Sequence, residues 1–280
     1  MELSATGFLS YLQIPVRWTS PQLPHQVRLR RFGIHRLPEG GNGGDRSIEG
    51  GTIEKHLAEL GVFQRIRSAA RTDRLVSALG GNAFTVSSER DPEDILSYLN
   101  ASIEDMLFYA YARVAEGFNP RHCKMKQYRY HITGNNINAE RLERILSMFQ
   151  GTHDFRNFAK ADRRNTVRRI DRIEVMSDGD TVTVDFYAQS FIWHQIRSIM
   201  GFALHYVESE EVPEPFSLQG RNRFLAEPEY LVLVDIEYEG VQFRHTVKRS
   251  KLEGALESYR KHSVRASLWK GMADRAVGGQ

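Results

Sequence analysis

Residues 166–207 read TVRRIDRIEVMSDGDTVTVDFYAQSFIWHQIRSIMGFALHYV, and this stretch decides the fold class. The segments 166–176 and 181–189 alternate apolar and polar residues, which is typical of strands. Between them, SDGD (177–180) is a hairpin signal. The apolar run at 191–207 then predicts a helix. A strand pair followed by a helix that packs on it indicates an α+β protein.

The flanking residues extend this pattern in both directions. QYRYHIT (127–133) alternates as a strand, and the segment 138–151 predicts a helix with Asn138 as its N-cap and Gly151 just past its end. EYLVLVDIEYE (229–239) predicts a last strand. The resulting order is β-α-β-β-α-β, which is the split βαβ or ferredoxin-like unit.

The first half of the chain predicts the same order of elements. Its expected segments are an opening strand within 7–34, a helix at 48–60 capped by Ser47, strands at 62–69 and 82–88, a helix at 91–99 and a strand at 106–114. We therefore expect two tandem ferredoxin-like halves that share one central antiparallel or mixed sheet. With a boundary near GFNPRH (117–122), the predicted domains are 1–118 and 119–280.

The composition limits the class of protein. The chain has 280 residues, 41% of them hydrophobic, and a single cysteine, Cys123. No stretch approaches the roughly 18 apolar residues of a membrane helix, and the N-terminus lacks the basic start of a signal peptide. We expect a cytoplasmic protein without disulfides that is not bound to a membrane. No HExxH, CxxC, GxGxxG or GxxxxGK[ST] motif occurs, so we expect neither a metal nor a cofactor.

Basic residues gather in two places. Between Arg156 and Ile173 there are seven cations and two acids, a local charge of +5, and a second basic stretch covers 27–36. Aromatic residues lie among them, including Phe155 and Phe158. This combination favours RNA or DNA binding. The residues expected to contact phosphates are Arg156, Lys160, Arg163, Arg164, Arg168 and Arg169.

One loop candidate combines an acid with several cations. RSAARTDRLVSALGG (67–81) places Arg71, Thr72, Asp73 and Arg74 side by side between two strand candidates. A polar turn and a carboxylate that performs chemistry both fit this pattern.

Three stretches in this order resemble one family. ARTDRLVSALG (70–80), GTHDFRNFA (151–159) and SFIWHQIRSIMG (190–201) are similar to signature segments of the TruA-type tRNA pseudouridine synthases, with Ser77 as in archaeal members. SIEG (47–50), KQYRY (126–130) and YLVLVDIEY (230–238) are weaker matches. The resemblance implies the pseudouridine synthase fold, with an active-site cleft between the halves. It also implies a homodimer without cofactor that isomerises uridines at positions 38–40, in the anticodon stem-loop of tRNA.

The resemblance also implies roles for individual residues. Asp73 matches the catalytic carboxylate, and Arg197 matches the helix arginine that pairs with it and can hold it bidentately. Tyr128 matches a tyrosine that stacks on the target base and serves in proton transfer from C5. Leu231 matches a leucine that packs against the base. Arg71 matches the arginine that helps to hold the flipped-out nucleotide.

Three positions in these motifs depart from the family pattern, and one of them is Ala70, which replaces the glycine or serine before the R-T-D core. Leu75 stands where the signature has glycine, and a leucine with a left-handed backbone would be strained, so we expect this loop to be shaped differently or to relax by other means. Lys126 replaces the first arginine of the family's RTYRY segment. A non-catalytic RNA-binding or RNA-folding protein on the same scaffold is the alternative. A metal-dependent nuclease is disfavoured because clustered carboxylates are absent from the sequence.

Overall fold

The computed structural model of the protein describes residues 27–34, 48–73, 75–103, 106–133, 137–160, 165–178 and 181–246, and the single positions 253, 257 and 268. The helices are α1 (Ile48–Glu59), α2 (Pro92–Ser102), α3 (Ala139–Ser147) and α4 (Gln195–Tyr206), with 3₁₀ turns η1 (Phe155–Phe158), η2 (Pro215–Ser217) and η3 (Pro228–Tyr230). The strands are β1 (Val27–Ile34), β2 (Arg67–Ser68), β3 (Ser77–Ser87), β4 (Met106–Val114), β5 (Met125–Thr133), β6 (Gly151–Asp154), β7 (Val167–Ile170), β8 (Arg172–Asp178), β9 (Thr181–Ala188), β10 (Leu231–Glu237) and β11 (Arg244–His245).

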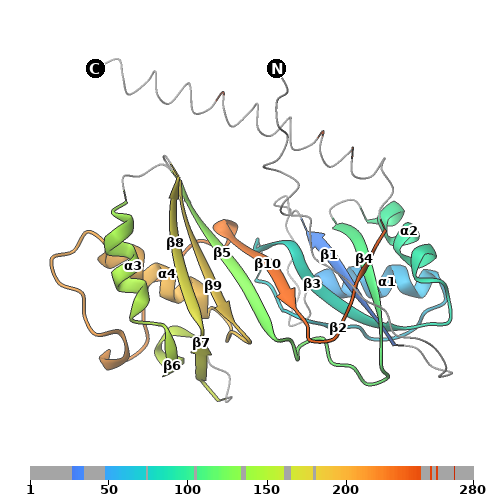
Figure 1. Ribbon diagram of the computed structural model, residues 1–280, viewed down its shortest axis with the longest axis horizontal. Coiled ribbons are helices and arrows are strands. Elements are labelled where there is room, and N and C mark those ends of the chain that lie inside the picture. The colour runs from blue at the N-terminus through green and yellow to red at the C-terminus, as the bar shows by residue number, and fades with distance from the viewer. Residues whose placement is uncertain are drawn as a thin grey trace.

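One large sheet runs through the molecule (Figure 1). Its strand order is β11-β4-β1-β3-β10-β5-β9-β8, and β2 also pairs with β3. When the four strands of each half are numbered 1 to 4 along the chain, each half has the ferredoxin-like order 4-1-3-2. In the first half this order is β4-β1-β3-β2, and in the second it is β10-β5-β9-β8. The predicted fold class, two tandem ferredoxin-like halves sharing one sheet, is confirmed.

A single edge of β3 joins the two halves. Its C-terminal part pairs antiparallel with β2, at Thr85 and Phe84, while its N-terminal part pairs parallel with β10, at Ser77 and Ala78. Both partners fit on this edge because β2 has only two residues. The predicted strand at 62–69 was therefore too long. The chain leaves the sheet after β2 and re-enters it at β3, so the loop between them lies at the junction of the halves.

Two further sequence predictions were wrong in detail. The expected strand at 166–176 is broken at Asp171 into β7 and β8, and β7 pairs with β6 in a separate small sheet. The helix expected from residue 191 begins only at Gln195 because His194 has a left-handed backbone, with φ of 66°. Residues 191–194 are thereby a short connection at the helix start.

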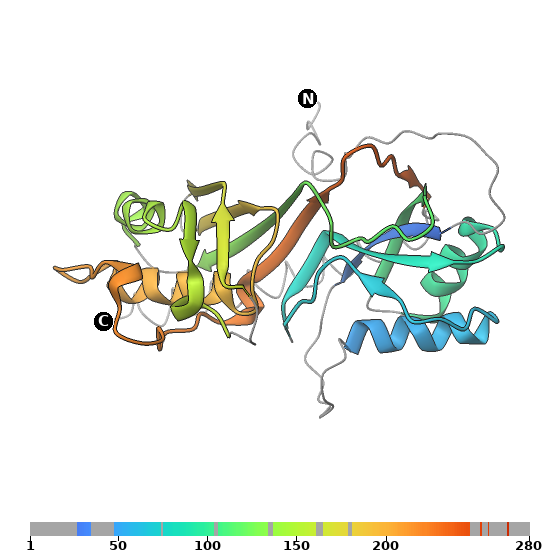
Figure 2. The same ribbon diagram turned by 90° about the horizontal axis from the view of Figure 1, so that it is seen from below.

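The helices cover the sheet through two groups of buried side chains. In the N-terminal half, Ile53 and Leu57 of α1 and Leu99 of α2 are fully buried in one cluster with Phe84 and Phe108. In the C-terminal half, α3 and α4 pack on alternate residues of β5 and β9. Figure 2 shows α1 and α4 on the same side of the sheet. In the part of the chain that the structure describes, no helix is long and apolar enough to cross a bilayer.

The opposite face of β5 and β9 carries a buried ion pair. The Nε of Arg129 donates to Asp185 Oδ1 and its Nη2 donates to Oδ2, both at 2.7 Å. The Asp185 side chain is 1% exposed. A buried carboxylate needs such a partner, so this arginine of the KQYRY segment ties β5 to β9.

Candidate active site

The loop between β2 and β3 is fixed at its start by two buried polar side chains. The fully buried Asn82 accepts from the N–H of Ala70 at 3.2 Å and donates to the Ala70 carbonyl at 3.3 Å. Lys126 Nζ donates to the carbonyl of Ala69 at 2.8 Å. Two side chains of the sheet thus hold the backbone that leads directly into Arg71, Thr72 and Asp73.

Lys126 is unusual for a lysine because it lies in the interior, 8% exposed. Burial lowers the pKa of its ammonium group; Cys123 opposes that shift and the charge of Arg121 adds to it. The replacement of the family's arginine by lysine therefore keeps a donor at this position, and that donor holds the loop backbone.

Leu75 adopts the left-handed conformation that a glycine would take, so the expectation of a differently shaped loop was wrong. Its φ is 73°, and the N–H of Val76 donates to the carbonyl of Asp73 at 3.1 Å, which closes a turn. A positive φ at the third position of a turn favours glycine. The loop keeps the shape that glycine would serve, and the leucine bears the strain.

The carboxylate of Asp73 contacts three side chains at the start of α4. Arg197 Nη1 donates to Asp73 Oδ2 at 2.8 Å, which confirms the predicted contact. Trp193 Nε1 donates to Asp73 Oδ1 at 2.6 Å. His194 Nε2 lies 3.4 Å from Oδ2.

The prediction that Arg197 could hold the carboxylate with two nitrogens was wrong. Its Nε donates to the carbonyl of Ala226 at 2.8 Å, and the N–H of Ala226 returns a bond to the Arg197 carbonyl at 2.9 Å. The guanidinium is thus divided between a backbone oxygen and Asp73. With a side chain only 12% exposed, Arg197 is held in one orientation.

Close packing between α4 and the segment around Phe224 supports this arrangement. A Cβ at Gly201 would lie 2.6 Å from the carbonyl carbon of Phe224. Asn222 Nδ2 donates to the Ser198 carbonyl at 2.8 Å and to the Phe224 carbonyl at 3.0 Å. The glycine of the SFIWHQIRSIMG segment is therefore needed for close approach, and the approach brings Ala226 to Arg197.

Trp193 is a site residue that sequence reasoning missed. Its side chain is 52% exposed, although its position in an apolar run predicted a buried helical residue. Lys160 Nζ lies over the indole ring, 4.3 Å from its centroid, and the Lys160 N–H donates to the Trp193 carbonyl at 2.9 Å. The signal that could have found it is a tryptophan four residues before the arginine that pairs with Asp73.

His194 adds no formal charge beside Asp73 near neutral pH. Burial is the main cause that lowers the pKa of its imidazole, and the cations Arg197 and Lys160 lower it further. The carboxylate of Asp73 acts in the opposite direction. The His194 side chain is largely buried beside Asp73.

Tyr128 and Leu231 come from the neighbouring strands β5 and β10. Tyr128 is 8% exposed and packs edge to face on Phe191, with ring centroids 5.3 Å apart. Leu231 is 5% exposed and lies opposite Tyr130 in the β5–β10 register. Since Tyr128 and Leu231 are two residues out of register, they are diagonal neighbours on the helix-covered face of the sheet.

The predicted phosphate contacts divide into three groups. Arg156 is ion-paired with Asp154, and Arg169 donates from Nε to Asp171 at 2.8 Å, yet both guanidinium groups are largely exposed. Arg168 donates to two backbone carbonyls, and Lys160 lies on Trp193. Arg163 and Arg164 lie outside the described residues. Arg71 is exposed on the Asp73 loop.

The adjacent His153 and Asp154 of the GTHDF segment have separate structural partners. His153 stacks on Phe216 with centroids 4.1 Å apart, and its Nε2 is hydrogen-bonded to the Gln150 carbonyl at 2.7 Å. Asp154 caps η1 by accepting from the Arg156 N–H. Hydrogen bonds from Arg156 and then Thr166 lower the pKa of Asp154 to about 2.

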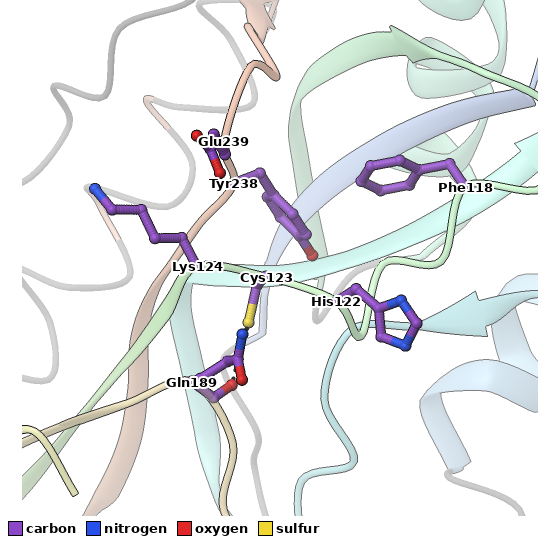
Figure 3. A pocket seen from close by; sticks show the side chains of 7 residues that line it. All are labelled: Phe118, His122, Cys123, Lys124, Gln189, Tyr238 and Glu239. Atoms are coloured by element: carbon purple, nitrogen blue, oxygen red, sulfur yellow. Dashed lines mark hydrogen bonds between the residues drawn. The ribbon is translucent and has the colours of Figure 1, made fainter. Parts of the chain in front are cut away.

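A polar pocket of about 350 Å³ lies elsewhere on the junction, beside the connection from β4 to β5 (Figure 3). It is lined by Phe118, His122, Cys123, Lys124, Gln189, Tyr238 and Glu239. The Cys123 thiol donates to the Gln189 carbonyl at 3.3 Å, and burial raises the pKa of that thiol. None of the predicted site residues lines this pocket.

Comparison with known proteins identifies close relatives. A family model described as tRNA pseudouridine synthase matches residues 145–239. A tRNA pseudouridine synthase A from Picrophilus torridus is 46% identical over 205 residues, which cover 72% of this chain and 78% of that protein. Enzymes with the same name from Thermoplasma acidophilum and Thermoplasma volcanium are 41% and 38% identical, with 77% of this chain covered in both cases and 84% and 87% of those proteins.

Proposed function

The chain belongs to the tRNA pseudouridine synthase A family and isomerises uridine to pseudouridine in tRNA, and from this premise we propose that Asp73 is the nucleophile of the reaction. The observation that carries the proposal is the position of its carboxylate. Asp73 Oδ2 accepts from Arg197 Nη1 at 2.8 Å, and the donor reaches it from the other half of the molecule. The guanidinium of Arg197 orients the carboxylate through a charged hydrogen bond, and a positioned carboxylate can act as a covalent catalyst.

The reaction defines what the remaining residues must supply. The C1′–N1 bond of the uridine breaks, the detached uracil turns, and a C1′–C5 bond forms while C5 loses a proton and N1 gains one. No oxidant or reductant is consumed. We assign to Tyr128 the stacking on the base and a part in moving the C5 proton, and to Leu231 the packing against the ring.

A uridine in a stem must leave the stack before it can reach Asp73. Extrusion costs a few kcal/mol of lost pairing and stacking. We assign to the exposed Arg71, two residues before Asp73, the task of holding the flipped-out nucleotide. A cation beside the vacated position offsets part of this cost because it neutralises the neighbouring phosphates.

The proposed substrate region is the anticodon stem-loop. Exposed cations on η1 and β7, above all Arg156 and Arg169, are the proposed phosphate contacts, with Arg163, Arg164 and Arg168 beside them in the sequence. Such contacts position RNA without reading its sequence and make binding dependent on salt. The proposal includes a homodimer that acts in the cytoplasm.

The alternative of a non-catalytic RNA-binding protein does not account for the Asp73 site. A pure binder gains nothing from an acid that Arg197 and Trp193 hold in place. An RNA backbone repels a carboxylate, so such an acid in an RNA site is retained for chemistry rather than for affinity.

The test is to map pseudouridine in unmodified tRNA transcripts after incubation with the protein, by carbodiimide-dependent stops of primer extension. We expect stops within the anticodon arm. A transcript with cytidine at the uridines of that arm is the control and should give none there. Stops confined to other arms would contradict the proposed region, and the absence of stops despite tight tRNA binding would contradict the enzymatic activity itself. Full activity of Asp73→Ala in the same assay would contradict Asp73 as nucleophile.

A further inference from the structure

The carboxylate of Asp73 has a second donor in addition to Arg197. Trp193 Nε1 donates to Asp73 Oδ1 at 2.6 Å, while Arg197 Nη1 donates to Oδ2 at 2.8 Å. We propose that Trp193 is a positioning residue for this reaction: its indole N–H fixes the orientation of the Asp73 carboxylate that Arg197 alone leaves undetermined. The inference rests on the proposed role of Asp73 as nucleophile.

The torsion of an aspartate carboxylate explains why one donor is insufficient. Rotation about χ2 of aspartate has broad, shallow minima. A single bond from Arg197 to Oδ2 leaves the plane of the carboxylate able to turn about that contact. A second bond to Oδ1, from a different direction, fixes the plane and therefore the direction of the remaining lone pairs. Preorganised groups of this kind lower the barrier because no reorientation is needed during the reaction.

Lys160 in turn holds the indole of Trp193 in place. Lys160 Nζ lies 4.3 Å from the ring centroid, and the Lys160 N–H donates to the Trp193 carbonyl at 2.9 Å. A cation over an aromatic face is attracted by the ring electrons. It also draws electron density from the ring, which strengthens the N–H as a donor to Asp73.

Packing does not account for a tryptophan at this position. The side chain is 52% exposed, so about half of its surface remains in water, where an apolar ring gains little. What the indole provides here is an N–H at a fixed distance from the backbone, and that N–H is used on Asp73 Oδ1. His194, the neighbouring residue, contacts the other oxygen at 3.4 Å.

Two variants separate the donor from the ring. Trp193→Phe removes the N–H but keeps an aromatic ring, and Trp193→His places a ring nitrogen near the position of the indole nitrogen. We expect Trp193→Phe to lower the single-turnover rate at saturating enzyme about tenfold, the effect of one hydrogen bond to a charged group. We expect its tRNA Kd to stay within about twofold of wild type and Trp193→His to recover most of the rate. Equal rates for Trp193→Phe and wild type, or equal losses for both variants, would overturn the inference.

A measurement on the enzyme without RNA tests the contact independently. In protein labelled with ¹⁵N-tryptophan, the indole signal of Trp193 is the one lost in Trp193→Phe. We expect Asp73→Ala to shift that signal and to speed its exchange with water. An unchanged Trp193 signal would contradict the contact.

The outcomes also separate this inference from the proposed function. An inactive Asp73→Ala together with a fully active Trp193→Phe would overturn the role of Trp193 alone. A fully active Asp73→Ala would overturn the role of Asp73 as nucleophile, even if the indole signal responds to the substitution.

Discussion

Arg197 Nη1 donates to Asp73 Oδ2 at 2.8 Å across 124 residues of sequence, from helix α4 of the C-terminal half to a loop of the N-terminal half. The contact exists because β10 pairs with the edge of β3 that the short β2 leaves available. The acid and its cation therefore come together only when both halves form one sheet.

Replacement of Arg197 by an uncharged residue should slow catalysis without weakening RNA binding. For Arg197→Met we expect the single-turnover rate to fall at least about a hundredfold, since an uncompensated carboxylate and a lost charged hydrogen bond together cost about 3 kcal/mol or more. Filter binding should show tRNA affinity within about threefold of wild type. Arg144→Met, at an exposed position of α3, is the matched control and should keep the full rate. Equal rates for both variants would show that the pairing is not needed.

The backbone strain at Leu75 should be measurable as a gain in the free energy of unfolding when it is relieved. A left-handed leucine costs about 1–2 kcal/mol relative to a residue without Cβ, and part of that gain is lost to the greater freedom of glycine in the unfolded chain. With φ of 73° at Leu75, we expect Leu75→Gly to raise the free energy of unfolding by about 0.5–1 kcal/mol, measured by chemical denaturation. A loss of stability would mean that the leucine side chain contributes more by packing than its backbone costs.

A methyl group added at Gly201 should destabilise the protein, whereas Leu75→Gly should stabilise it. Because a Cβ there would lie 2.6 Å from the Phe224 carbonyl carbon, Gly201→Ala should lower the free energy of unfolding by about 1–3 kcal/mol. It should also lower the turnover rate, because the shifted segment carries the Ala226 carbonyl that holds Arg197. The control is Gly51→Ala in α1, where the added atom meets nothing within 4 Å. That helical substitution should raise stability by about 0.5–1 kcal/mol.

The buried Lys126 should make the free energy of unfolding depend on pH. Its pKa lies below the usual 10.5 because of burial, so between its folded pKa and 10.5 the unfolded chain binds more protons than the folded one. The free energy of unfolding should then rise with pH over that window because of this residue. Compared with Lys126→Met, the wild type should gain stability in urea titrations as the pH rises towards 10.5. A difference between the two proteins that is independent of pH would contradict the buried position of the ammonium group.

The sequence predicted the order of elements and the Asp73–Arg197 contact for different physical reasons. Alternating and helical periodicities depend on local neighbours, so β4, β5 and β9 were expected within two residues of their observed ends. The contact followed from the family resemblance together with an arginine inside an apolar helix. An arginine in that position requires a partner.

Features that depend on backbone pairing or on a single dihedral could not be predicted. The division of the β3 edge between β2 and β10 follows from hydrogen bonds over two residues each. The left-handed His194 delays the start of the helix within the apolar run 191–207, and this places Trp193 outside the helix. The apolar run alone indicated a buried Trp193, although its indole donates to Asp73.

The most direct test of the central claim is the release of tritium from C5 of uridine in labelled tRNA by Asp73→Asn. This variant keeps the size of the side chain and an oxygen that can accept from Trp193, but it removes the attacking carboxylate. We predict no release above the level without enzyme, with tRNA binding unchanged. Release at the wild-type rate would contradict the role of Asp73 as the nucleophile.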